Sequence, residues 1–297
     1  MKTPQLSQDR YQSILSDTLG IILRLTLFSI IYISQSTGLA GYFANPVIIL
    51  AIIGFILPSL PKRQSFWVIV AILITLKSLS EWSTQDNHRY LFNYWCIALA
   101  IAMGHKDPLK MLAMNARIFI GLAFAFAVIW KGFLSPDFRN GDYFHFIYLT
   151  DSRFQYFLQI FCQIPAETIN NNYGLMHQLA ESPTLQVQLQ GMDHLHLIAQ
   201  MTTWWTLLIE STVAIAFLSP TKKWLGPYRD WLLMTFAIVT YFVITISSFG
   251  IILMTLGYTQ SSVNNLRIRR AYMATIVIIF VFAKMKPLVI LVKVLGL

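Results

Sequence analysis

Three side chains at the ends of apolar segments have the types needed for proton transfer. Asn87 and His88 stand side by side where the polar loop SEWSTQDNHRY turns into an apolar run, and Lys131 follows the apolar run RIFIGLAFAFAVIW. A neutral histidine shielded from water can act as a general base or hydrogen-bond partner, and an amine in an apolar surround can act as a base. The structural alternatives are helix capping by Ser83 and Asp86, and a lysine that snorkels to a membrane interface.

Glu210 is a candidate of another kind, because it is an acidic residue inside the apolar segment QMTTWWTLLIESTVAIAF, residues 200–217. Ionisable residues at such depth usually face the protein interior and have a partner. Arg24 is the expected partner, and both a structural ion pair and a proton-handling role are open. The candidates for contact with a substrate are Trp205, Glu210, Tyr241, Arg267 and Arg270. For the tryptophan, packing or an aromatic belt is the alternative.

The composition indicates which elements position these residues. Of the 297 residues, 56% are hydrophobic and 12% are charged, against roughly 25% charged residues in soluble domains. Several apolar blocks reach the about 20 residues that a helix needs to cross a membrane. We therefore predict an all-α, polytopic integral membrane helical bundle that forms a single domain over residues 1–297. We expect about eight spans: 18–36, 43–60, 65–80, 89–105, 112–133, 197–218, 230–257 (interrupted near Ser247-Ser248-Phe249-Gly250) and 271–290.

The positions of Lys and Arg predict a cytoplasmic N-terminus, because the short loops that would then be inside are basic. The connection 134–196 would lie on the outer face as an extramembrane or interfacial segment with short helices, and it holds six acidic residues against two arginines. Asn87, His88 and Lys131 then fall at the same outer mouth, where His88 and Lys131 should line one cavity. The arginines at 267, 269 and 270 depart from this pattern. Either residues 230–257 form a re-entrant hairpin, or these arginines are held outside for a reason, and we expect the second.

Other features predict no additional chemistry. The net charge of +9 is explained by Lys and Arg in cytoplasmic loops, so no nucleic-acid partner is expected. Asp193-His194-Leu195-His196 predicts no metal site, since alternate residues on a helix point to different sides and no further His or Cys cluster lies nearby. No phosphate-binding glycine loop, nucleophile elbow or dinucleotide fingerprint is present.

Three segments resemble a known family. DNHRYLFNYW, residues 86–95, resembles the Asn-Asn-His-Ser-Tyr-Leu-Tyr stretch of vitamin K-dependent γ-carboxylase. FAFAVIWKGFLSPDFRNG, residues 124–141, is similar to the segment of that enzyme, and of the bacterial horizontally transferred transmembrane (HTTM) domain family, in which a lysine is followed by Asp-Trp and then Gly; here Asp137-Phe138 and Gly141 occupy those places. WWTLLIEST, residues 204–212, resembles a stretch with a tryptophan followed by an acidic residue within a span. The segments come in the family order.

The resemblance implies a mechanism on a reduced, vitamin K-like quinone, with no metal. In the carboxylase a lysine deprotonates the reduced quinone with the help of an Asn-His pair, and oxygen then gives a strong alkoxide base. Carried over, Lys131 would be the quinone base, with His88 assisting and Asn87 orienting.

The chain also departs from the family. The interval from Lys131 to Gly141 is one or two residues longer, and TYFVITISSFG, residues 240–250, lacks the family's second histidine. The chain ends at Leu297, where the carboxylase continues into a large lumenal domain for its protein substrate. We therefore predict base-initiated chemistry on a reduced quinone or another lipid-soluble substrate at the outer membrane face, rather than glutamate carboxylation.

Two alternatives are open. One is a non-catalytic membrane subunit or assembly factor that keeps the family scaffold in contact with membrane lipid and docks a membrane protein partner through the arginines at 267–270. The other is a transporter, supported only by Glu210 and Arg24.

Overall fold

The structure, a computed structural model, describes residues 8–35, 38–83, 85–181, 188–191, 194–220, 223, 225–244 and 246–285. Every regular element in these ranges is a helix, so the all-α prediction is confirmed for the described residues. The long helices are α1 (Gln8–Ile33), α2 (Gly38–Ile56), α3 (Gln64–Ser80), α4 (Asn87–Ala102), α5 (Pro108–Ile129), α10 (Leu195–Leu218), α11 (Arg229–Val243), α12 (Ser247–Gln260) and α13 (Leu266–Met285). The shorter ones are η1 (Leu60–Lys62), η2 (Trp130–Leu134), α6 (Pro136–Asn140), α7 (Asp142–Thr150), η3 (Ser152–Phe154), α8 (Gln155–Phe161), α9 (Ala166–Glu181) and η4 (Gly226–Tyr228).

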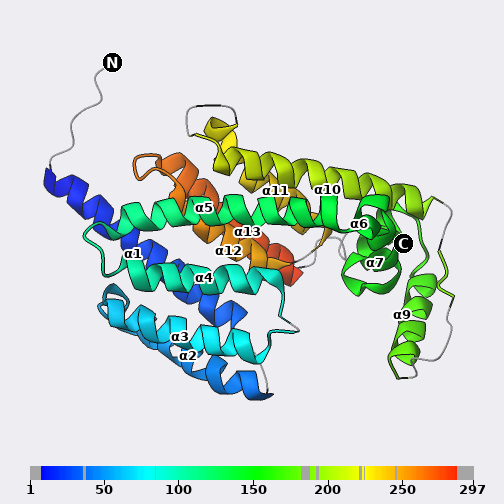
Figure 1. Cartoon of the computed structure of the whole chain (residues 1–297), viewed down its shortest axis with the longest axis horizontal. Helices are drawn as coiled ribbons and strands as arrows, with labels where there is room; N and C mark the ends of the chain where they lie inside the picture. The colour runs from blue at the N-terminus through cyan, green and yellow to red at the C-terminus, as the bar shows by residue number, and fades with distance from the viewer. Residues whose placement is uncertain are drawn as a thin grey trace. The chain divides into compact units, whose positions relative to one another are not determined.

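The chain forms two compact units. The first consists of Met1–Ile120 and Ser247–Val277, and in it α3 packs between α2 and α4 while α1 contacts α2 and α12 (Figure 1). Two buried tryptophans join its helices: Trp67 Nε1 donates to the carbonyl of Pro61 over 2.7 Å, and Trp95 Nε1 donates to Thr26 Oγ1 over 3.0 Å. These bonds satisfy the indole N–H groups, so both large rings can be buried.

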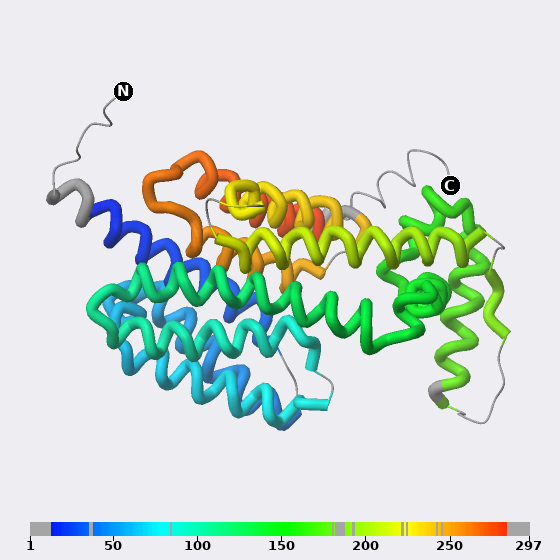
Figure 2. Tube along the Cα trace, turned by 45° about the horizontal axis from the view of Figure 1, so that its top comes forward, coloured from blue at the N-terminus to red at the C-terminus, as the bar shows by residue number. Residues whose placement is uncertain are grey.

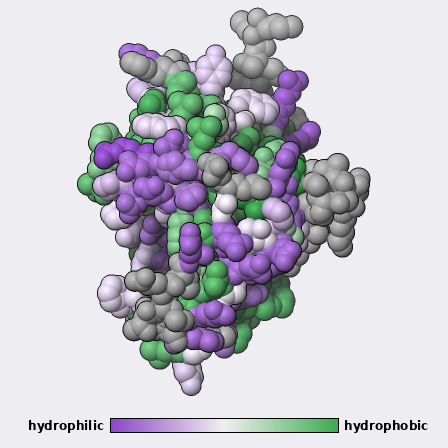
Figure 3. Space-filling view, turned by 90° about the vertical axis from the view of Figure 1, so that its right-hand side faces the viewer, coloured by the Kyte–Doolittle hydropathy of each residue, from purple (hydrophilic) through white to green (hydrophobic). Residues whose placement is uncertain are grey.

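The second unit consists of Gly121–Ile246 and Ile278–Leu297. Here α10 is the central helix, because it packs against α6, α7, α11 and η4, and it runs beside the last turns of α5 (Figure 2). The core of the connection after α5 is formed by Tyr148, Leu149, Phe154, Leu158, Cys162, Ile164, Ile169, Leu195 and Ala199. In Figure 3, which turns the side with α6, α7 and α9 in Figure 1 toward the viewer, hydrophilic side chains form patches among hydrophobic ones.

Four helical segments of the described chain are long and apolar enough to cross a membrane: Ser13–Ile33, Gly38–Ile56, Pro108–Leu134 and Leu195–Leu218. Each corresponds to one of the eight segments predicted as spans. The helices at three other predicted spans are shorter: α3 has 17 residues, α4 has 16, and the span 230–257 contains α11 with 15 and α12 with 14. The eight-span count and the orientation therefore stay predictions.

The predicted span 230–257 is wrong as one helix interrupted at Ser247–Gly250. The structure contains two helices, α11 and α12, and the serines begin the second one. The break comes earlier, at Ile244, whose φ of −128° and ψ of 120° are extended. The β-branched residues gathered around Ile244 lose side-chain freedom in a helix, which favours an extended backbone there.

Candidate functional site

Lys131 lies on a π-helical turn, η2, which continues α5. A π turn takes one residue more than an α turn and occurs frequently at functional sites. The interval from Lys131 to Gly141, which is longer than in the resembled family, contains most of this turn. After it, Ser135 caps α6 by accepting a bond from the amide of Phe138 over 3.3 Å. The turn and the cap together set the direction in which the lysine leaves the end of α5.

The Lys131 ammonium and the Glu210 carboxylate form an ion pair, with 2.5 Å between Nζ and Oε1. The glutamate side chain is 9% exposed and the lysine side chain 24% exposed. Glu210 Oε2 is buried and has no hydrogen-bond partner among the described residues. The partner that the structure shows for Glu210 is therefore Lys131, whereas Arg24 was the partner expected from the sequence. Two residues chosen separately for their chemistry are brought together.

Phe138 and Gly141 support this pair from the segment that follows. The lysine Nζ lies 5.3 Å from the centroid of the buried Phe138 ring, within the range of a cation–π contact. Gly141 has a φ of +89°, and a Cβ at this position would lie 2.8 Å from Gln200 Cγ and 3.1 Å from the Gln200 backbone. Glycine is therefore required both by its conformation and by the close approach of α10.

Trp205 and Tyr241 differ in their surroundings. Trp205 is 52% exposed, and five residues of helix place it about 140° round α10 from Glu210. Tyr241 of α11 is fully buried, and its hydroxyl has no partner among the described residues. Thr203, two turns before Glu210 on α10, likewise has a buried hydroxyl oxygen without a partner. A buried polar group without a partner is costly, which makes Tyr241 and Thr203 candidates for contact with a bound molecule in the second unit.

Asn87 and His88 begin α4 in the first unit. Asp86 occupies the N-cap position as expected, but its side chain makes no capping bond, so the predicted side-chain cap is wrong. His88 Nε2 lies 2.9 Å from Ser248 Oγ, and its ring lies 5.7 Å from the Phe249 ring. Asn87 is exposed. Lys131 belongs to the second unit, so a shared cavity for His88 and Lys131 stays a prediction.

The arginines at the start of α13 do not behave alike. Arg267 and Arg270 are exposed, whereas Arg269 is 5% exposed. Arg269 Nη1 donates to Thr18 Oγ1 over 2.6 Å, and its guanidinium lies 4.4 Å from the centroid of the Tyr258 ring. The middle arginine therefore holds α13 to α1 and α12 inside the first unit, and Arg267 and Arg270 are available for contact with other molecules.

The histidines around the start of α10 have structural partners. His194 Nε2 lies 3.0 Å from the carbonyl of Cys162, and the rings of His145 and His196 meet edge to face at 5.5 Å. Asp193 lies outside the described residues. Burial raises the pKa of the Cys162 thiol to about 11, so this thiol stays protonated at neutral pH. Within the described ranges, no three His, Cys, Asp or Glu side chains gather in a way that would hold a metal ion.

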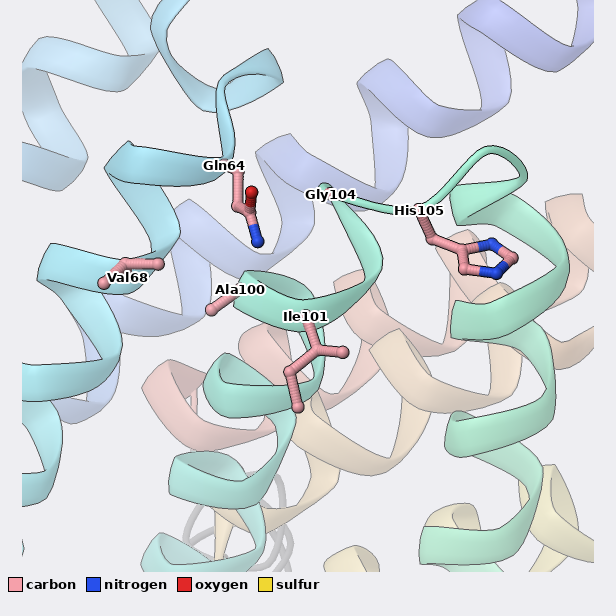
Figure 4. A pocket seen from close by; sticks show the side chains of 6 residues that line it. All are labelled: Gln64, Val68, Ala100, Ile101, Gly104 and His105. Atoms are coloured by element: carbon pink, nitrogen blue, oxygen red, sulfur yellow. The ribbon is translucent and has the colours of Figure 1, made fainter.

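A shallow depression of about 270 Å³ lies between the first turn of α3 and the end of α4 (Figure 4). Its two polar side chains, Gln64 and His105, contact residues in or beside the depression. The Gln64 amide covers Gly104, where a Cβ would come within 2.5 Å of its Nε2, and His105 Nδ1 accepts a bond from the amide of Asp107 over 3.2 Å. Neither Asn87 nor His88 lines this depression, so it adds nothing to the predicted chemistry.

Comparison of the chain with protein-family models, with curated proteins and with solved structures finds no match. The resemblance to the γ-carboxylase-like HTTM family therefore stays a prediction that depends on the quoted segments. Sequence reasoning selected Lys131 and Glu210 but not their contact. Ser248 is one of the polar residues in the segment where the family has its second histidine, but its contact with His88 was not predicted.

Proposed function

We propose that the chain is an integral membrane protein of the γ-carboxylase-like HTTM class, in which Lys131 takes a proton from a reduced quinone or another lipid-soluble substrate. Its four long apolar helices support the membrane placement. Eight spans, a cytoplasmic N-terminus and an outer-face connection over 134–196 belong to the same proposal. The observation that carries the chemistry is the contact between Lys131 and Glu210, because it joins two of the three segments that resemble the family.

The residues around the pair suit a reduced quinone. Such a quinone supplies a phenolic hydroxyl as proton donor and the electrons for the later oxygen step. Glu210 Oε2 is a buried acceptor without a partner among the described residues, so it can accept a hydrogen bond from that hydroxyl. Phe138 presents an aromatic ring beside Lys131 Nζ. Together, the buried Glu210 oxygen, the Lys131 amine and the Phe138 ring would bind and orient an aromatic diol.

The pair can hold the proton that is removed. In its basic form it consists of an amine beside a carboxylate, and uptake of one proton at Lys131 Nζ gives an ammonium. Glu210 Oε1, at 2.5 Å, then accepts a charge-assisted hydrogen bond from the ammonium. Such bonds are short and strong where water is largely excluded. Lys131 acts as the base and Glu210 positions it; the roles of His88 and Asn87 depend on the resemblance.

The test is turnover of reduced vitamin K by the purified protein in detergent. Lys131→Ala should lower the rate at least about 100-fold, the usual cost of losing a general base. Lys110→Ala removes an exposed lysine outside the pair and should keep the wild-type rate. A Lys131→Ala protein that works at the wild-type rate would refute the proposed base.

The alternative is a non-catalytic membrane subunit or assembly factor. The exposure of Arg267 and Arg270 favours it, since unburied guanidinium groups can bind acidic groups of a partner. In that case the Lys131–Glu210 pair is a structural ion pair. A wild-type protein that does not turn over reduced quinone, but co-purifies with a stoichiometric protein that is lost on changing Arg267 and Arg270 to Gln, would establish this alternative.

A further inference from the structure

A cavity of about 420 Å³ lies in the first unit between α1 and the corner where α2 turns into α3. Its volume is within the range of small-molecule sites. The corner contributes Gly54, Pro58, Pro61 and Lys62, and α1 contributes one face of the helix from Ser16 to Leu27. Neither Asn87 nor His88 lines it, so this cavity is separate from the histidine site of the same unit.

The cavity combines two cations, one carboxylate and apolar residues. Arg24 and Lys62 line it and are exposed, and neither forms an ion pair with Asp17, which lines the same cavity. Arg24 is exposed, so its guanidinium is accessible to a ligand in this cavity. The remaining lining is mostly apolar: Ile21 is 36% exposed and Leu27 is fully buried.

The order of the charged groups along α1 matches the order of groups in a phospholipid headgroup. Arg24 and then Asp17 follow one another toward the N-terminal end of the apolar segment Ser13–Ile33. A helix rises 1.5 Å per residue, so Asp17 is about 10 Å farther along the axis than Arg24. Helix side chains lean toward the N-terminus, so the long Arg24 side chain shortens this interval. In a membrane the apolar chains lie deepest, the phosphate comes next, and a headgroup amine lies outermost.

We infer that this cavity binds an amine-bearing phospholipid, with the phosphate between Arg24 and Lys62, the headgroup ammonium at Asp17 and the acyl chains on the membrane side of Arg24. Basic pockets between membrane helices are suited to lipid headgroups because guanidinium and ammonium groups form charge-assisted bonds to phosphate. The inference depends on the membrane placement proposed above and is independent of the reaction.

Gly20 offers a way to close the cavity without removing a charge. It lines the cavity on α1, and a Cβ at this position would meet no atom within 4 Å. A larger side chain therefore enters open space, and replacing a helical glycine favours the helix. Gly20→Phe should fill the cavity while the protein folds normally, and Gly20→Ala is the matched small replacement.

The experiment measures bound lipid by native mass spectrometry on delipidated protein in detergent, with phosphatidylethanolamine, phosphatidylglycerol or inorganic phosphate added. Resistance of the protein to extraction by alkaline carbonate is measured first, which tests the membrane placement separately. We expect one phosphatidylethanolamine per chain. Arg24→Gln and Lys62→Gln should each weaken it about tenfold, as expected for loss of a hydrogen bond to a charged group. Gly20→Phe should abolish it, while Gly20→Ala and Arg63→Gln, a neighbouring exposed cation outside the cavity, should leave it within about twofold.

Three results would overturn the inference. Unchanged binding in both Arg24→Gln and Gly20→Phe would place the lipid elsewhere. Full displacement by millimolar inorganic phosphate would make this a site for free phosphate. If phosphatidylglycerol binds equally well, and Asp17→Asn does not change the preference between the two lipids, the site does not recognise a headgroup amine.

Discussion

Lys131 and Glu210 each have an ordinary structural explanation when considered singly, as a snorkelling lysine and as a buried acid with some partner. Their 2.5 Å contact explains the position of both residues, because they neutralise each other inside the second unit. Such pairs cost desolvation that their attraction offsets only with good geometry. Glu210 Oε2 has no partner among the described residues, so the geometry is incomplete as a purely structural device. This orphan oxygen is the residue-scale reason to regard the pair as a binding group.

Gly141 tests the backbone that supports the pair. Gly141→Ala should be destabilising by more than the about 1–2 kcal/mol of left-handed strain, because the new Cβ would also meet the Gln200 backbone at 3.1 Å. Gly38→Ala is the matched control: its φ is +63° and a Cβ there meets nothing within 4 Å, so it suffers the strain alone. Unfolding in detergent, followed by circular dichroism, compares the two variants. Equal losses of stability in the two variants would show that the new Cβ at position 141 does not clash with Gln200 of α10.

At the scale of elements, long apolar runs predicted helices well and helix interruptions poorly. Helix existence follows from composition and length, so α1, α2, α5 and α10 were expected where they occur. The break at Ile244 depends on local crowding of β-branched residues. The glycine beside two serines, at 247–250, led to a break predicted at the wrong residues. The π turn at Lys131 had only an indirect signal, an interval longer than in the resembled family. Contacts between helices, such as Lys131 with Glu210, follow from packing and are not encoded in either segment alone.

The contact between α7 and α10 should depend on pH through His145. Burial, and then the neighbouring His196, lower the pKa of His145, while Asp142 raises it. The unfolded chain, with an ordinary value of about 6.5, therefore takes up a proton first as the pH falls. His145 contributes stability above about pH 6.5, and this contribution is lost on acidification. The thermal unfolding midpoint should fall more between pH 7.5 and 5.5 in the wild type than in His145→Gln. Equal falls would contradict this linkage.

At the scale of the whole molecule, the open question is how often the chain crosses the membrane. Basic loops predicted the orientation, and the arginines at 267–270 were the exception. The structure makes the exception sharper, because α11 and α12 are separate helices of 15 and 14 residues. Neither reaches the about 20 residues of a full span. In the proposed orientation, a single crossing by the two helices would place Arg267 outside, and a hairpin would place it inside.

Single cysteines can decide between these topologies. Cys96 and Cys162 are buried and unpaired, so a background with both changed to Ala should not react with a membrane-impermeant maleimide. Into it we would place Lys110→Cys, Arg139→Cys or Arg267→Cys, three exposed positions. In intact cells the changes at 139 and 267 should be labelled, because both positions lie in segments predicted to be outside. The change at 110 should be labelled only after lysis, because Lys110 lies in a basic loop predicted to be cytoplasmic. Labelling at 267 only after lysis would make α11 and α12 a re-entrant hairpin, and the same result at 139 would reverse the proposed orientation.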